Sequence, residues 1–394
     1  MKSVKKRFQG LSVVLAVLTV LVFSGTSAFA GVITWDKTFG GSDGDDAESI
    51  IQTSDGGYIV AGDTESKGAG GKDAWVIKLD KYGNKKWDKT FGGKDFDGAN
   101  SITQTSDGGY IVAGDTNSKG AGEYDAWVIK LDKNGNTEWD KTFGGSSYDE
   151  AESIIQTSDG GYIVAGFTGS KGAGSWDTWV IKLDKNGNKE WDKTFGGSDS
   201  DGANSIAQTS DGGYIVAGWT GDDVWVIKLD KNGNKEWDKT FGGSDKDEAY
   251  SIVQTSDGGY IVAGYTDSKG GDDDAWVIKL DKNGNEEWDK TFGGNFLDDA
   301  NSIAQTSDGG YIVAGYTRSK GAGGDDAWVI KLDKNGNKKW DKTFGGSDWD
   351  KANSVIQTSD GGYIVAGDTE SKGAGGDDAW VIKLDKNGNL RGEK

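Results

Sequence analysis

Two aspartates recur in every repeat of this chain, and no other residues have a type and spacing so suited to chemistry. One set follows each Gly-Gly pair: Asp45, Asp97, Asp149, Asp201, Asp247, Asp298 and Asp350. The other set precedes each Trp-Val-Ile-Lys-Leu segment: Asp73, Asp125, Asp177, Asp223, Asp274, Asp326 and Asp378. Ca²⁺ takes about six to eight oxygens, more than two carboxylates supply, and Asp commonly fixes loops by accepting backbone N–H bonds. We therefore expect no cofactor, with calcium kept as the alternative.

The sequence gives less support to other kinds of catalytic or metal-binding site. The chain contains no His and no Cys, which removes the commonest general base, a thiol nucleophile and any disulfide. The recurring Asp-Lys-Asn-Gly-Asn segments are turn chemistry, since Phe143 stands where an EF-hand starting at Asp132 needs its Glu. Paired carboxylates could serve a glycosidase, but nothing singles out a pair. The chain is predicted not to be an enzyme, with a carbohydrate hydrolase or lyase as the alternative.

The repeats differ from one another mainly at aromatic positions near two loops. The position after Tyr-Ile-Val-Ala-Gly is Asp in some units and Phe, Trp or Tyr in others, an exchange that a packed core does not tolerate. We therefore expect solvent-exposed aromatics on one face, suited to a polysaccharide or an extracellular protein. Neutral drift in permissive loops, in a purely structural protein, is the competing interpretation. The candidate ligand-binding residues are Phe96, Tyr148, Phe167, Trp176, Trp219, Tyr265, Tyr316 and Trp349.

These positions belong to a repeat of about 50 residues, a period typical of propellers and solenoids. The Trp of Trp-Asp-Lys-Thr-Phe falls at Trp35, Trp87, Trp139, Trp191, Trp237, Trp288 and Trp340. Each unit holds four strand-like segments bounded by Gly, Asp and Asn, the first set being Ala47–Thr53, Tyr58–Gly62, Trp75–Leu79 and Trp87–Phe91. Four antiparallel strands in such a unit predict one propeller blade and an all-β fold.

The ends of the chain predict how the blades are arranged. A fourth strand, Ile33–Phe39, comes before any complete unit, and the last unit ends without one. The first strand can complete the last blade only in a closed ring, which also removes the open edge between them. An open solenoid would need polar caps, which the repeats lack. We predict a seven-bladed β-propeller over residues 31–394, closed by the N-terminal strand.

The series Asp-Ala-Trp-Val-Ile-Lys-Leu-Asp-Lys-Asn-Gly-Asn…Trp…Thr-Phe-Gly-Gly resembles a bacterial and archaeal β-propeller repeat family of secreted and cell-surface proteins. That resemblance implies an extracellular propeller but no single activity. The segment from Leu183 to Trp191 also resembles the tryptophan-docking motif of pyrroloquinoline-quinone propellers. Those enzymes typically have eight blades and a vicinal disulfide, so the seven repeats and the missing Cys argue against a quinoprotein.

The N-terminus and the net charge bear on location and partners. Met1–Ala30 has the basic start, the short apolar run and the Ala-Phe-Ala end of a signal peptide, with an uncleaved anchor as the alternative. The formal charge of −20 repels nucleic acid and anionic lipid. We expect a secreted or cell-surface monomer that binds a polysaccharide or an extracellular protein, with no nucleic acid and no membrane span after signal removal.

Overall fold

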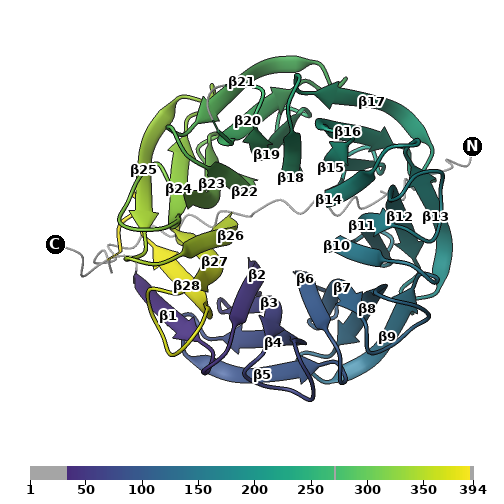
Figure 1. Ribbon diagram of the computed structural model, residues 1–394, viewed down its shortest axis with the longest axis horizontal. Helices are drawn as coiled ribbons and strands as arrows, with labels where there is room; N and C mark the ends of the chain where they lie inside the picture. Colours follow the sequence, from purple (N-terminus) through teal and green to yellow (C-terminus); the bar gives the residue numbers. More distant parts are fainter. Residues whose placement is uncertain (1–32, 270–271, 391–394) are drawn as a thin grey trace, which may run out of the picture. The chain divides into compact units, whose positions relative to one another are not determined.

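The computed structural model describes residues 33–269 and 272–390, and the predicted signal peptide, Met1–Ala30, lies outside them. The described residues form a seven-bladed β-propeller in which each blade is a four-stranded antiparallel sheet (Figure 1). The predicted fold class is confirmed. In this part of the chain no helix has the length and hydropathy of a membrane span.

Each blade places its strands outward from the central axis (Figure 1). The innermost strands are β2 (Asp45–Gln52), β6 (Asp97–Gln104), β10 (Asp149–Gln156), β14 (Asp201–Gln208), β18 (Asp247–Gln254), β22 (Asp298–Gln305) and β26 (Asp350–Gln357). The second strands are β3 (Tyr58–Thr64), β7 (Tyr110–Thr116), β11 (Tyr162–Thr168), β15 (Tyr214–Thr220), β19 (Tyr260–Thr266), β23 (Tyr311–Thr317) and β27 (Tyr363–Thr369). The third strands are β4 (Asp73–Leu79), β8 (Asp125–Leu131), β12 (Asp177–Leu183), β16 (Asp223–Leu229), β20 (Asp274–Leu280), β24 (Asp326–Leu332) and β28 (Asp378–Leu384). The outermost strands are β5 (Lys85–Phe91), β9 (Thr137–Phe143), β13 (Lys189–Phe195), β17 (Lys235–Phe241), β21 (Glu286–Phe292), β25 (Lys338–Phe344) and β1 (Trp35–Phe39).

The ring closes as the two ends of the sequence predict. Strand β1 pairs antiparallel with β28, with Thr38 opposite Trp380 and Phe39 opposite Ala379. The last blade therefore reads β26, β27, β28 and β1 from the axis outward. Because β1 comes from the start of the propeller, the first and last repeats are joined by hydrogen bonds and no blade edge is left open between them.

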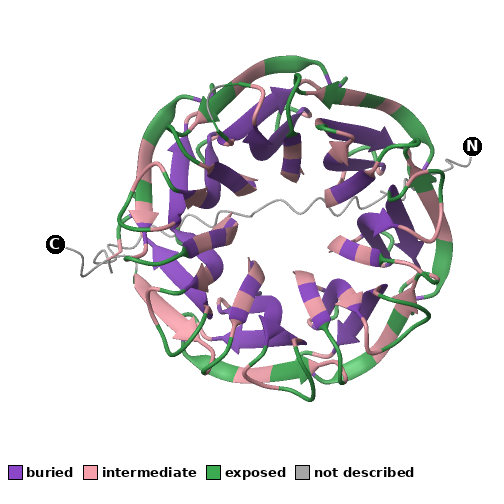
Figure 2. Ribbon diagram, in the orientation of Figure 1, coloured by how far each residue is buried: buried purple, intermediate pink, exposed green. Residues whose placement is uncertain are grey.

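The hydrophobic core lies between blades rather than within them. The middle strands β3 and β4 are buried along their whole length, whereas the outermost strands are largely exposed (Figure 2). One core cluster joins Tyr58 and Trp75 of one blade to Ile364 and Val381 of its neighbour. Both faces of each sheet are thus apolar, so a blade is stable only when neighbours cover both faces.

A tryptophan on each outermost strand docks onto the next blade. The ring of Trp87 lies edge-on to Tyr110, with 6.1 Å between ring centroids. The same indole covers Gly135 in the β8–β9 turn, where a Cβ would come within 2.7 Å of it. Gly135 also has a φ of +78°, which favours glycine. The turn glycine thus serves both the hairpin and the contact between blades.

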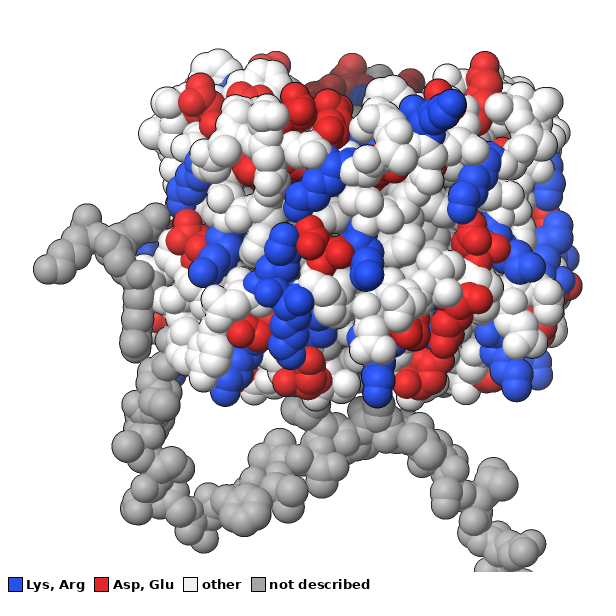
Figure 3. Space-filling model, turned by 90° about the horizontal axis from the view of Figure 1, so that it is seen from below, with Lys and Arg blue, Asp and Glu red and all other residues white. Residues whose placement is uncertain are grey.

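The outer wall carries charges of both signs (Figure 3). Ion pairs such as Lys67–Asp88, with 2.8 Å between Nζ and Oδ2, link the outermost strands to the loops beside them. The wall in view in Figure 3 shows Lys and Asp or Glu interspersed, without a large area of one sign. A surface of this kind favours solubility and does not by itself mark a binding site.

The contact between the tryptophan and the turn glycine can be tested by comparing two separate glycine-to-alanine variants in one blade. Gly135→Ala and Gly108→Ala both place a side chain at positive φ, where each should lose about 1 kcal/mol. Only Gly135→Ala also collides with Trp87, because Gly108 has open space within 4 Å of its Cβ position. We expect Gly135→Ala to lower the melting temperature by about 1–4 °C more than Gly108→Ala, since overpacking costs about 1–3 kcal/mol. Equal melting temperatures for the two variants would contradict the docking contact.

Candidate functional site

The innermost strands are held to one another by two invariant side chains. Ser49 accepts a hydrogen bond from the N–H of Ile102 on the next blade at 3.3 Å. Gln104 accepts one from the N–H of Ser54 at 2.8 Å, through its Oε1. Both contacts recur around the ring, including across the closure, where Ser359 donates to Gln52. The Ser and Gln of Ala-x-Ser-Ile-x-Gln-Thr are therefore explained by blade-to-blade bonding.

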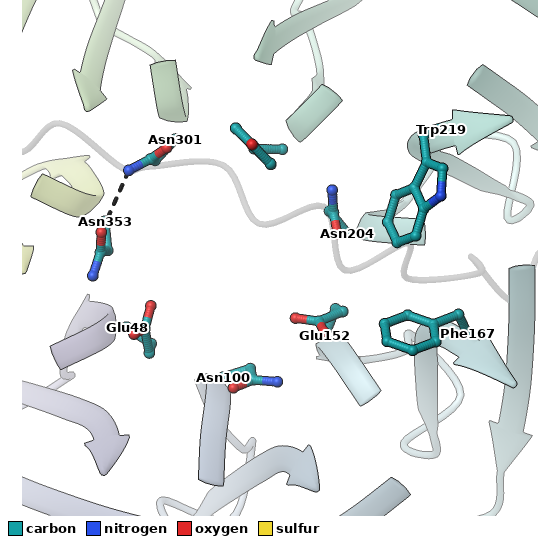
Figure 4. Close-up of a pocket in the computed structure, with 9 residues that line it drawn as sticks. Glu48, Asn100, Glu152, Phe167, Asn204, Trp219, Asn301 and Asn353 are labelled. Carbon is teal, nitrogen blue, oxygen red and sulfur yellow. Dashed lines mark hydrogen bonds between the residues drawn. The ribbon is translucent and has the colours of Figure 1, made fainter. Parts of the chain in front are cut away.

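The residue between Ala and Ser in this motif occupies a β-bulge. The register of β2 and β3 shifts between Ala47 and Ser49, so Glu48 has no partner on β3. Bulges re-aim a side chain and often occur at functional sites. The seven bulge positions all line one cavity of about 430 Å³ on the propeller axis (Figure 4). They are Glu48, Asn100, Glu152, Asn204, Tyr250, Asn301 and Asn353.

Sequence reasoning missed these seven residues. The signal was present, because this position differs between repeats while the flanking Ala and Ser do not. What the sequence could not show is that the position is a bulge facing the axis. Four of the seven are Asn, and their amide nitrogens bond the neighbouring blade. Asn100 Nδ2 donates to the carbonyl of Ala151 at 3.3 Å, and Asn204 Nδ2 to that of Ala249 at 2.9 Å.

Two of the predicted aromatic residues reach the same cavity, namely Phe167 on β11 and Trp219 on β15 (Figure 4). Their ring centroids lie 5.8 Å apart, and Phe167 also contacts Trp176 at 5.3 Å. Trp219 lies over Gly202 of the innermost strand, where any side chain would collide with the indole. The missing side chain of Gly202 lets an aromatic from the second strand reach the axis.

We predicted that the residues directly after Tyr-Ile-Val-Ala-Gly are exposed to solvent. This prediction is wrong in part. Phe167 is only 8% exposed and Tyr265 only 5%, while Trp219 and Tyr316 are half-buried. The exchange of Asp for Trp is tolerated because these side chains flank the innermost strands at one end of the axial channel, rather than the apolar core between blades. Asp63, Asp115 and Asp368 occupy the same position in the other blades.

Tyr265 and Tyr316 have separate surroundings. Tyr265 packs on Tyr250 with 5.7 Å between centroids, and burial raises the pKa of Tyr265 to about 12. The hydroxyl of Tyr316 donates to Asp299 Oδ2 at 2.5 Å, and Lys351 Nζ lies 5.1 Å from the ring centroid of Tyr316. The four aromatics that follow Tyr-Ile-Val-Ala-Gly thus divide into a Phe167–Trp219 contact and two separate tyrosine sites.

The other predicted residues lie in loops at the same end of the blades and are exposed. Tyr148 stacks on Tyr124 at 5.3 Å, and Lys351 Nζ lies 5.9 Å from the ring centroid of Trp349. Sequence comparison of the repeats also missed Phe296, which is 56% exposed, because it lies one position before the aligned series. The exposed aromatics of the described loops at this end are Phe96, Tyr148, Trp176, Phe296 and Trp349, here called the aromatic rim.

Carboxyl groups gather at the same end of the channel. Burial raises the pKa of Glu48 to about 7, with Asp46 adding to the shift while Lys72 and Lys351 oppose it. Burial likewise raises the pKa of Glu150 to about 7, and it raises that of its hydrogen-bonded neighbour Glu152 well above the ordinary range. These half-buried side chains are therefore held in an acidic site.

The recurring aspartates form pairs between blades, not within them. The carboxylates of Asp73 and Asp97 flank Gly92, and Asp97 accepts hydrogen bonds from the N–H of Gly93 at 2.8 Å and the hydroxyl of Thr116. Asp73 accepts N–H bonds from Ala69 at 2.9 Å and Gly70 at 3.3 Å. These contacts account for both sets as loop-fixing residues. Among the described residues, no three acidic side chains are arranged to hold a metal ion.

Comparisons with known proteins support the fold and no more. No protein-family model matches the sequence. The chain is 26% identical over 210 residues to the regulatory protein FlaEY of Caulobacter vibrioides, which covers 46% of this chain and 21% of that relative, about a fifth of its length. A solved protein from Lactobacillus plantarum is similar with a TM-score of 0.52 at 12% identity, covering 81% of this chain and 88% of that one. BamB from Moraxella catarrhalis has a TM-score of 0.48 at 14% identity, covering 86% and 98%.

Because the pKa values of these carboxyl groups are raised in the folded chain, we predict that the folded state becomes less stable as pH rises. The folded chain keeps a proton on Glu48 up to about pH 7, whereas the unfolded chain releases it near its ordinary value of 4.5. Stability from this group is therefore greatest below pH 4.5 and is lost as pH rises through 7. We expect a melting temperature about 3 °C or more lower at pH 8.0 than at pH 5.5, since one pKa unit corresponds to about 1.4 kcal/mol.

Replacing a carboxyl group by an amide of the same shape tests whether Glu48 is the titrating group. The measurement is thermal melting at the two pH values. Glu48→Gln should reduce the difference because it removes the titrating group. Asp211→Asn is the control, since its hydrogen bonds from Thr209 and Gly213 and its pairing with Lys228 outweigh the effect of burial and lower the pKa of Asp211 to about 2, outside this pH range. An unchanged difference in Glu48→Gln would show that Glu48 does not hold the proton.

Proposed function

We propose that this chain is an exported, non-catalytic binding platform whose ligand is a polysaccharide bound at the acidic, aromatic end of the channel. One observation carries the proposal. The blades are nearly identical in their two middle strands, and they differ at the positions that line the axial cavity and in the loops around it. Seven identical blades would surround a symmetric channel, whereas these differences build one asymmetric site within it.

The lining suits sugar rings. Aromatic side chains such as Phe167 and Trp219 present apolar faces, and Asn and Glu side chains supply the hydrogen-bonding groups that hydroxyls need. The cavity of about 430 Å³ lies within the usual range for small-ligand sites. The aromatic rim surrounds the same end of the channel, so a chain longer than the cavity would meet further rings. A ligand with several linked sugar rings would contact both the cavity and the aromatic rim.

Export is part of the proposal because of the residues at the N-terminus. The basic start and short apolar run of Met1–Ala30 are typical of a signal peptide. A binding site for an extracellular polysaccharide agrees with a secreted or cell-surface location. The acidic composition is compatible with both and disfavours nucleic acid.

A carbohydrate hydrolase is the second candidate, favoured by Glu48 and Glu152. Both side chains line the same cavity from different blades (Figure 4), and the pKa of each is raised by burial. Glycosidases use one protonated and one ionised carboxyl group on either side of the scissile bond. Release of reducing ends from a bound polysaccharide would favour this candidate over simple binding.

Glycan-array binding followed by titration of the best ligand tests the platform. Trp219→Ala should weaken binding about tenfold or more because it removes a ring that lines the cavity, and Tyr316→Ala should weaken it because it removes the hydroxyl that holds Asp299 on the strand of Asn301. Tyr82→Ala is the control, since Tyr82 is an exposed aromatic in the β4–β5 turn at the opposite end of the blade. Unchanged affinity in both Trp219→Ala and Tyr316→Ala would rule out the proposed site.

A further inference from the structure

We propose that the channel site recognises an ammonium group, so that its polysaccharide ligand contains amino sugars with free amino groups. This inference rests on the proposed function and narrows it to one class of ligand. It is carried by the distribution of charge around the cavity, the rings beside the acidic groups and the hydrogen-bonding capacity that the lining leaves unused.

Three carboxyl groups at the junction of two blades form no ion pair, although Lys72 partly offsets the charge of Asp115. Asp115 on β7 faces Glu150 and Glu152 on β10, and the three interact electrostatically. Among the described residues none of them forms an ion pair with Lys or Arg. The corresponding acids of the first blade are paired instead, since Lys72 Nζ lies 2.8 Å from Asp46 and 2.9 Å from Asp63. Carboxyl groups without an ion pair therefore gather at this junction, whereas the acids around Glu48 also face Lys72 and Lys351.

Aromatic rings adjoin this unpaired acidic group. Phe167 is the cross-strand neighbour of Glu150, and it contacts Trp219 of the next blade. Glu152, Phe167 and Trp219 lie on the same side of the cavity in Figure 4, away from Glu48. A cation held by carboxylates beside aromatic faces gains from charge pairing and from the ring quadrupole. A neutral ligand gains only from the rings.

A second acceptor is free on the opposite side of the channel. Asp299 is 6% exposed, and its Oδ1 accepts no hydrogen bond from the described residues, although its Oδ2 accepts one from Tyr316. Asp299 lies on β22 two residues before the bulge position Asn301, which lines the cavity. A buried carboxylate oxygen without a donor is costly, and a ligand that supplies an N–H or O–H removes that cost.

The rest of the cavity lining offers fewer hydrogen-bond donors than acceptors. The asparagines at the bulge positions donate amide N–H groups to the neighbouring blades. Asn301 Nδ2, for example, donates to the carbonyl of Ala352 at 3.2 Å. Their amide oxygens and the carboxylates remain as acceptors, except Asn353 Oδ1, which accepts from Asn301 Nδ2 at 3.4 Å. Amino sugars present hydroxyl and ammonium donors at every ring. A Lys-bearing peptide would supply the cation, but its backbone carbonyls need donors that this lining does not offer.

The test compares two oligosaccharides of equal length by calorimetric titration at pH 7.0. One is a glucosamine oligomer and the other an N-acetylglucosamine oligomer, which has the same backbone without the ammonium groups. We expect the glucosamine oligomer to bind at least tenfold more tightly. Glu152→Gln should weaken its binding about tenfold, with folding checked by thermal melting. Glu286→Gln is the control, because Glu286 is exposed on the outermost strand β21, away from the cavity, and we expect less than a twofold change.

The outcomes separate this inference from the proposed function. Equal binding of the two oligomers would overturn recognition of ammonium while leaving a polysaccharide platform in place. Equal effects of Glu152→Gln and Glu286→Gln would overturn the location of the site. Binding of a trilysine peptide with no binding of either oligomer would overturn both the amino-sugar inference and the polysaccharide proposal.

Discussion

The architecture depends on the contact between a tryptophan of one blade and a turn glycine of the next. Each sheet is apolar on both faces, so it needs a neighbour on each side. The tryptophans set the distance between neighbours because any side chain at the glycine would collide with the indole. Trp35 makes this contact with Gly83 across the closure, so the strand that completes the last blade also docks onto the first. With spacing set at the outer edge, the innermost strands are brought together around one cavity.

Within the innermost strand, neighbouring residues serve different purposes. Ser49 and its equivalents bond the next blade, and the alanine beside them is fully buried. The bulge between these residues leaves one side chain without a cross-strand partner. That side chain can change without loss of the fold, so substitutions there alter the channel and little else. A nearly symmetric ring thereby contains one asymmetric site.

The acidic groups of that site are held at a cost to stability. Burial disfavours ionised Glu48, Glu150 and Glu152, and the wall of the ring offers a contrast, since its Lys and Asp side chains pair in solvent (Figure 3). Functional sites are commonly retained at such a cost. An electronegative cavity with aromatic sides would lower its own electrostatic repulsion by binding a cation, which links the strain of the free site to the ligand class proposed for it.

The sequence by itself determined the repeat, the strand order, the seven blades and the closure of the ring, because alternation, turn residues and period are local properties. Phe96, Tyr148, Trp176 and Trp349 were also correctly predicted as exposed. Only the tertiary structure decided that Phe167 and Tyr265 are buried and that Glu48 and its six equivalents line the axis. Those facts depend on a one-residue bulge, which turns a side chain toward the axis, and on which blades become neighbours. A bulge is defined by pairing with another strand, and a cavity by the meeting of seven blades, so neither is a property of one repeat.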